Sequence, residues 1–130
     1  MQDSYKVLMI DDEQDIVGFF SKTFRIFKHI QFFTANRAGQ GIEIAKKEQP
    51  RVVLLDLRMP GMNGEEALIE LKSLLPETKF IVMTGWEDGA TQERIKRIGV
   101  DAYYIKPVDL EKVSTKTMSL LMLKDRSSND

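Results

Sequence analysis

The chain has 130 residues, 42% of them hydrophobic and 30% charged, which is typical of one globular domain with a substantial core. Its 19 basic and 20 acidic residues leave a net charge of -1, which argues against direct nucleic-acid binding and against a basic membrane-binding surface. The absence of cysteine excludes disulfides, thiolate metal sites and cysteine nucleophiles. The first residues lack the pattern of a signal peptide, so we expect a cytoplasmic protein that has no contact with a membrane.

Five short apolar segments alternate with five segments of helical periodicity. The apolar segments are residues 5–10, 30–34, 52–55, 80–83 and 102–105. After the first of them, apolar residues recur at helical spacing: Ile16, Phe20, Phe24 and Phe27. We expect the phenylalanine rings to belong to the core. The alternation predicts a (βα)5 fold of the doubly wound α/β class, with a parallel five-stranded sheet between two layers of helices. Residues 30–34 are the least uniformly apolar segment, so we place them at an edge of the sheet.

Turn-forming residues mark the ends of the predicted helices. Pro50 and Pro76 stop the second and third helices, and Gly99 follows the basic end of the fourth. Asp109 is the expected N-cap of the last helix. From residue 124 to residue 130 the chain loses all periodicity, so we expect one domain over residues 1–123 and a polar tail or the start of a linker beyond it.

Acidic residues follow two of the predicted strands. Asp56 ends the run at residues 52–55 and precedes a turn, and Asp11, Asp12 and Glu13 follow the first strand. Ligands of open α/β sheets bind at the carboxyl ends of the strands, and in the order 2-1-3-4-5 the first and third strands are neighbours. Asp56 could instead serve only to cap its turn, and the acids after the first strand could simply begin a helix. For Glu13 we favour that structural role.

Clustered carboxylates repel one another unless a cation neutralises them, and oxygen ligands of this kind suit Mg2+. Two further groups follow the fourth and fifth strands. Thr84 offers a hydroxyl and Lys106 offers an ammonium group, and either alone would be an ordinary surface residue. Their occurrence together with three acids, in one crevice at the edge of the sheet, predicts a functional site.

Four segments at the predicted strand ends occur in combination: Asp11-Asp12, the run from Asp56 to Gly64, Met83-Thr84-Gly85 and the run from Gly99 to Pro107. In this combination the chain resembles the receiver domain of two-component response regulators, from about residue 5 to residue 123. The resemblance implies a flavodoxin-like three-layer sandwich and a phosphorylated signalling domain of a phosphorelay. Such a domain is not an enzyme, although it assists its own phosphorylation and dephosphorylation. Its phosphodonor is a histidine kinase or a histidine phosphotransfer protein.

The resemblance also implies an output domain or effector protein as a partner, and it allows for a homodimer on phosphorylation. It makes Asp56 the phosphoacceptor. Mg2+ would be bound by Asp12, Asp56 and the backbone carbonyl of Arg58, with Asp11 acting through a metal-bound water. The peptide bond Lys106–Pro107 would be cis.

Further roles follow from the same resemblance. Thr84 and Lys106 would bind the phosphoryl group, and Thr84 and Tyr103 would form a conformational switch. The switch would act on the surface made by the fourth helix, the fifth strand and the fifth helix, near residues 90–98 and 102–123. Arg58 and Trp86 would border the approach of water to the acyl phosphate, and we expect these large side chains to lengthen its lifetime.

Two other classes of protein use related folds. A magnesium-dependent phosphohydrolase would need an acid two residues after its nucleophile, where this chain has Arg58, and it would need a cap over its substrate. A flavodoxin-like cofactor binder would need a phosphate-binding loop after the first strand. Asp11, Asp12 and Glu13 occupy that place and would repel a phosphate unless a metal intervened. The receiver domain is therefore the favoured interpretation.

Overall fold

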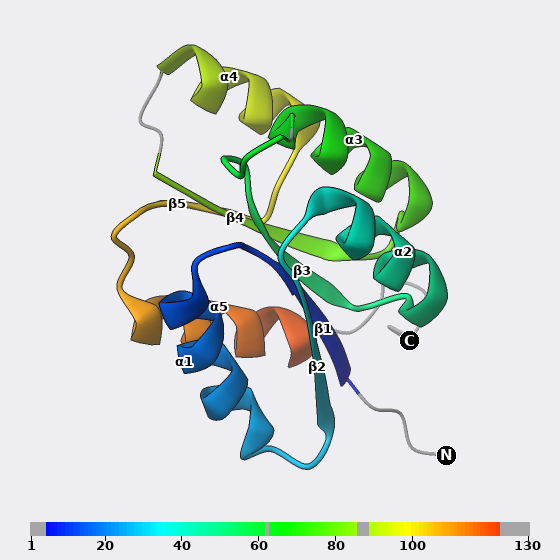
Figure 1. Cartoon of the computed structure of the whole chain (residues 1–130), viewed down its shortest axis with the longest axis vertical. Coiled ribbons are helices and arrows are strands. Elements are labelled where there is room, and N and C mark those ends of the chain that lie inside the picture. Colours follow the sequence, from blue (N-terminus) through cyan, green and yellow to red (C-terminus); the bar gives the residue numbers. More distant parts are fainter. Residues whose placement is uncertain (1–4, 62, 86–88, 123–130) are drawn as a thin grey trace.

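The computed structural model describes residues 5–61, 63–85 and 89–122, in which strands and helices alternate along the chain (Figure 1). The strands are β1 (Tyr5–Ile10), β2 (Ile30–Ala35), β3 (Val52–Asp56), β4 (Lys79–Thr84) and β5 (Ala102–Ile105). The helices are α1 (Gln14–Arg25), α2 (Ala38–Glu48), α3 (Gly64–Leu74), α4 (Gly89–Ile98) and α5 (Leu110–Met122). The predicted (βα)5 order is confirmed.

The strands form one parallel sheet in the order β2-β1-β3-β4-β5. β2 lies at an edge, as its mixed sequence predicted. β3 is central and buried along its whole length, because its four apolar residues are covered on both faces. The chain reverses its direction of winding between β1 and β3, and ligands bind at such a point in open α/β sheets.

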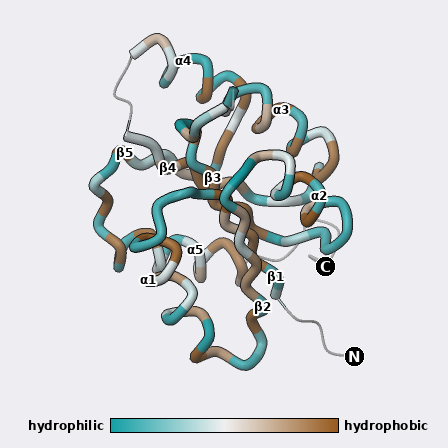
Figure 2. The backbone as a smooth tube through the Cα atoms, in the orientation of Figure 1, coloured by the Kyte–Doolittle hydropathy of each residue, from teal (hydrophilic) through white to brown (hydrophobic). Residues whose placement is uncertain are grey.

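The sheet is the middle layer of three. Helices α1 and α5 cover one face, and α2, α3 and α4 cover the other (Figure 1). Side chains of β3 alternate between the layers: Val53 and Leu55 pack toward α2, α3 and α4, while Val52 and Leu54 pack toward α1 and α5. Figure 2 shows hydrophobic residues along the central strands and many hydrophilic residues along the outer helices. The doubly wound, flavodoxin-like class is therefore confirmed.

Local details agree with the predicted boundaries to within one residue at each strand end. Asp56 and Thr84 are the last residues of β3 and β4 and do not follow these strands. Asp109 caps α5, since its Oδ1 accepts a hydrogen bond from the backbone N–H of Lys112 at 3.2 Å. Gly99 follows α4 with a φ of 98°, a left-handed conformation that favours glycine.

The predicted core face of α1 is wrong at one position. Phe20 and Phe24 are fully buried, but Phe27 is exposed. The helix ends at Arg25, so the helical spacing that aligns Ile16, Phe20 and Phe24 no longer applies at residue 27. In the described ranges, every helix is too short or too polar to cross a membrane.

Candidate functional site

Asp56 lies at the carboxyl end of the central strand and is almost completely buried. Its Oδ1 accepts a hydrogen bond from the backbone N–H of Arg58 at 2.9 Å, which closes the first turn after the strand. Its Oδ2 is turned to Lys106. The carboxylate therefore caps its turn with one oxygen and directs the other to Lys106, so capping of the turn does not prevent it from contributing to a site.

Two more carboxylates lie beside Asp56 because β1 and β3 are neighbours, with Ile10 paired to Leu55. Asp11 is buried and Asp12 is exposed. One oxygen from each of the three aspartates lies within 4.8 Å of the others. A single cation could contact all three, and carboxylate oxygens together with open positions for water suit Mg2+. The donor set fits the metal that the sequence predicts.

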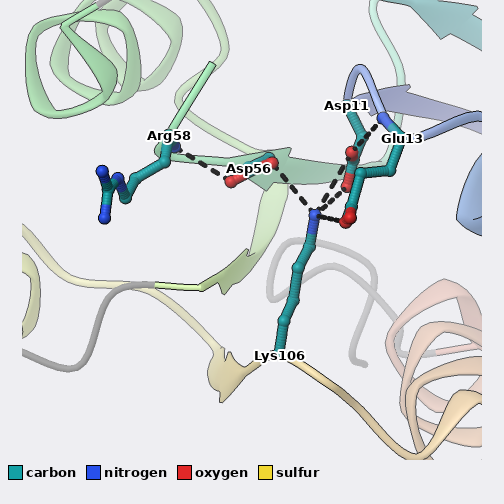
Figure 3. A network of polar contacts seen from close by, with 5 residues as sticks. All are labelled: Asp11, Glu13, Asp56, Arg58 and Lys106. Carbon is teal, nitrogen blue, oxygen red and sulfur yellow. Dashed lines mark hydrogen bonds and ion pairs between the residues drawn. The ribbon is translucent and has the colours of Figure 1, made fainter.

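Lys106 reaches into this cluster from the residue after β5 (Figure 3). Its Nζ lies 3.0 Å from Asp11 Oδ2 and 3.0 Å from Asp56 Oδ2, and it also donates to Oε1 of Glu13. The backbone N–H of Lys106 donates to the carbonyl of Thr84 at 2.8 Å, which fixes the start of the side chain against β4. The bond Lys106–Pro107 is cis, as the resemblance implies.

Burial controls the protonation of the inner carboxyl groups. It raises the pKa of Asp11 and of Asp56 above the ordinary value of 3.8, and hydrogen bonds from Lys106 and from the backbone of Glu13 and Arg58 offset this only in part. Burial alone would lower the pKa of Lys106, but its hydrogen bonds to Glu13, Asp56 and Asp11 outweigh burial and raise that pKa. Lys106 is therefore a permanent positive charge, and a further cation would favour ionisation of the carboxyls.

Thr84 and Tyr103 lie on the strands next to this cluster. Asp56 is paired with Met83, so Thr84 is one residue beyond it on β4, and it is fully buried. Tyr103 packs against the core on the side of α2, α3 and α4, and its phenol oxygen is buried. Tyr104 packs on the opposite side, with α1 and α5.

The loop between β3 and α3 is held in place by close backbone packing. A Cβ atom on Gly64 would lie 2.3 Å from the carbonyl oxygen of Leu57, so only glycine fits there. Asn63 caps α3 by accepting a hydrogen bond from the backbone N–H of Glu66 at 3.1 Å. The contact with Gly64 fixes Leu57 and hence the next residue, Arg58, whose carbonyl is a predicted metal ligand.

The side chain of Arg58 points away from the carboxylates (Figure 3). It lines a cleft of about 720 Å³, to which Thr84 and Arg94 also contribute. This cleft lies beside the three aspartates and does not include them. Trp86, the other residue expected to restrict water, lies outside the described residues.

Glu13 is the one member of the cluster that the sequence interpretation missed. It was expected only to begin a helix, and it does precede α1, with its backbone N–H donating to Asp11 Oδ1 at 2.9 Å. Its side chain, however, pairs with Lys106 (Figure 3). No sequence pattern predicts a contact between positions 13 and 106. The contact depends on the distance between the ends of β1 and β5 in the folded sheet. The one local signal is a glutamate at a helix N-cap, where shorter polar residues are preferred.

Comparison with known proteins decides the family. Residues 7–117 match the family described as the response regulator receiver domain. The chain belongs to this family. It is therefore a signalling domain of two-component systems, whose members carry a phosphoaspartate, and the resemblance found in the sequence is confirmed. The two alternative classes, a phosphohydrolase and a cofactor-binding flavodoxin, are therefore not supported.

Several known proteins are similar over most of the chain. Sporulation initiation phosphotransferase F of Bacillus subtilis is 30% identical over 119 residues, which cover 92% of this chain and 95% of that protein. A receiver domain protein from Methanospirillum hungatei has a TM-score of 0.84 at 26% identity, covering 92% of this chain and 94% of that structure. A response regulator from Burkholderia pseudomallei, solved with a phosphorylated aspartic acid and a calcium ion, shares the fold with a TM-score of 0.76 at 20% identity. That match covers 89% of this chain and 72% of that structure.

Other curated relatives are longer than this chain. Residues of this chain cover 25% of one such relative and 52% of another. The similarity therefore spans only part of these longer proteins.

Proposed function

We propose that this receiver domain accepts a phosphoryl group on Asp56 from the phosphohistidine of a histidine kinase or a histidine phosphotransfer protein, with Mg2+ bound. One observation carries the proposal: carboxylates from β1 and β3 meet the ammonium group of Lys106 from β5 at one edge of the sheet. The phosphorylated aspartate and calcium ion in the Burkholderia pseudomallei protein support the same chemistry.

The chemistry proposed for Asp56 is a displacement at phosphorus. A carboxylate oxygen forms a bond to phosphorus while the bond from phosphorus to the donor imidazole breaks, and the electron pair of that bond stays on the imidazole nitrogen. The product is an acyl phosphate. Lys106 remains protonated throughout and offsets charge on the phosphoryl oxygens. Hydrogen bonds from the backbone N–H of Arg58 and from Lys106 orient the carboxylate of Asp56 before the donor arrives.

Asp12, Asp56 and the backbone carbonyl of Arg58 would hold Mg2+, and Asp11 would act through a bound water. When bound, the metal supplies positive charge to the phosphoryl oxygens. The turn after β3 supports this assignment, because the backbone N–H of Arg58 donates to Asp56 Oδ1 and holds Arg58 next to the carboxylate. The burial-raised pKa values of Asp11 and Asp56 support it as well, since a cation there would favour the ionised form.

Thr84 would bind the phosphoryl group through its hydroxyl, and Lys106 would pair with it. Movement of Thr84 toward the new charge would free space for Tyr103, which packs against the core on the side of α2, α3 and α4. The change would then reach the surface of α4, β5 and α5, where an output domain, an effector protein or a second copy could bind. The end of this surface at residue 123 lies outside the described residues.

Other assignments complete the proposal. Arg58 and Trp86 would slow hydrolysis of the acyl phosphate by restricting water. The receiver domain would extend over residues 1–123, and residues 124–130, which lie outside the described residues, would be a tail or the start of a linker. The protein would act in the cytoplasm without nucleic-acid or membrane contacts of its own. It would assist its own phosphorylation and dephosphorylation without acting as an enzyme.

Intact mass tests the proposal. Acetyl phosphate with Mg2+ should add one phosphoryl group to the wild type, and either a chelator or Asp56→Asn should prevent the addition. Addition to the same extent in Asp56→Asn would contradict the assignment. Beryllofluoride, a mimic of the phosphoryl group, should then shift amide resonances of α4, β5 and α5 in the wild type and shift them less in Thr84→Ala. Shifts confined to the loops around the carboxylates would contradict the switch.

A further inference from the structure

The ammonium group of Lys106 has two kinds of partner in this site. Asp11 and Asp56 lie inside the site, with side chains 0% and 4% exposed, and both belong to the proposed metal-binding set. Glu13 lies at the mouth, with its side chain 54% exposed, and it is not in that set. Lys106 itself is 11% exposed, so its charge depends on these carboxylates more than on water.

The metal and Lys106 would share carboxylates, since Asp11 and Asp56 belong to the proposed metal-binding set and both contact Lys106. A divalent cation bound by Asp12 and Asp56 would stand close to Nζ, which now lies 3.0 Å from Asp56 Oδ2, and two cations at such separations repel. Lys106 would have to give up part of its contact with the inner carboxylates. Because the ammonium group of Lys106 is mostly shielded from water, it would need another negatively charged partner when the metal binds.

Glu13 is placed to be that partner. Its backbone N–H donates to Asp11 Oδ1 at 2.9 Å, so the residue stays anchored to the end of β1. Its side chain forms no capping hydrogen bond with α1 within the described residues and extends to Lys106 (Figure 3). The contact is independent of the metal-binding oxygens, so it can persist when they bind a cation.

We infer that Glu13 is a positioning residue for Lys106: its ion pair holds the ammonium at the mouth of the site when Mg2+ occupies the carboxylates. This inference rests on the proposed function and adds a residue to it. Glu13 thereby assists metal binding without contacting the metal, and it keeps Lys106 where an incoming phosphoryl group would meet it.

A double-mutant cycle of Mg2+ affinity tests the inference, with dissociation constants taken from amide shifts at fixed ionic strength. Glu13→Gln should weaken Mg2+ binding about fivefold, the effect of a partly exposed ion pair. The matched control Asp15→Asn removes an exposed acid in the first turn of α1 and should weaken it by less than about twofold, because salt screens such a charge. Lys106→Met should tighten Mg2+ binding, since it removes the competing cation.

The decisive comparison is Glu13→Gln in the Lys106→Met background, where its effect should fall to that of Asp15→Asn. An equal effect in both backgrounds would mean that Glu13 acts on the metal by its charge alone and would overturn the inference. The ammonium signal of Lys106 in proton–nitrogen spectra gives a second readout. It should persist with Mg2+ in the wild type and be lost to exchange in Glu13→Gln, and its persistence in that variant would also overturn the inference.

The same titration separates this inference from the proposed function. If amides near Asp11, Asp12 and Asp56 do not respond to Mg2+ in the wild type, the proposed metal site fails. If they respond and the cycle shows no coupling between Glu13 and Lys106, only the role of Glu13 fails. Glu13→Asp, whose shorter side chain keeps the charge, should give an intermediate affinity.

Discussion

Replacing Gly64 by alanine should disturb both the stability of the fold and the proposed metal site. The added Cβ would lie 2.3, 2.5 and 2.8 Å from the carbonyl oxygen, Cα and carbonyl carbon of Leu57, whereas ordinary contacts begin at 3.4 Å. These are backbone atoms of a buried residue, so no side-chain rotation relieves the overlap. We therefore expect a loss of about 3 kcal/mol in the free energy of unfolding, at the upper end of the range for overpacking.

Urea denaturation measures this loss, and thermal unfolding should show a fall of roughly 10 °C for a domain of this size. Gly18→Ala is the matched control, because a Cβ there has no neighbour within 4 Å and the residue lies inside α1. It should gain about 1 kcal/mol from helix propensity. The Gly64 variant should also bind Mg2+ more weakly. A displaced Leu57 would move the next residue, Arg58, whose carbonyl is a proposed metal ligand. Equal stability of Gly64→Ala and the wild type would refute the reasoning.

Three further predictions concern the site itself. With a chelator present, Asp56→Asn should be more stable than the wild type at pH 7. Burial holds the pKa of Asp56 in the folded state above the ordinary value of 3.8. The free energy of unfolding of the wild type therefore falls as the pH rises above 3.8, because the buried carboxyl group must ionise. The Asp56→Asn variant has no such group and should not show this fall. Urea curves across this pH range check it, and a variant less stable at pH 7 would contradict it. Trp86→Ala should shorten the lifetime of the acyl phosphate, measured by the decay of phosphorylated mass, and an unchanged decay would mean that the indole does not restrict water. Thr84→Ala should still accept a phosphoryl group, and a failure to do so would assign the hydroxyl to the transfer step and not to the switch.

Much of the fold could be predicted from the sequence because apolar segments and turn residues repeat with a clear period. Residues 52–55 could be identified as a central strand from four apolar residues in a row, and residues 30–34 as an edge strand from their mixed composition. Phe27 was misplaced because helical spacing shows which residues share a face only while the helix continues, and the end of α1 at Arg25 has no strong signal.

The candidate site was predictable to the extent that its residues lie at the carboxyl ends of strands. The proximity of Asp11, Asp56 and Lys106 could be predicted, because the carboxyl ends of parallel strands lie at the same edge of the sheet. The contact of Glu13 with Lys106 could not, because it depends on the reach of two side chains that are 93 positions apart. The close approach of Gly64 to Leu57 depends in the same way on the path of the loop, and a glycine in a sequence does not show whether a turn or a neighbour requires it.

The most direct test of the account is to locate the phosphoryl group on the chain. Borohydride reduces an acyl phosphate of aspartate to homoserine, which tandem mass spectrometry can place at a single residue. After treatment with acetyl phosphate and Mg2+, the account predicts homoserine at position 56 and none when Mg2+ is chelated. Homoserine at position 11 or 12, or the same yield at position 56 without the metal, would contradict it.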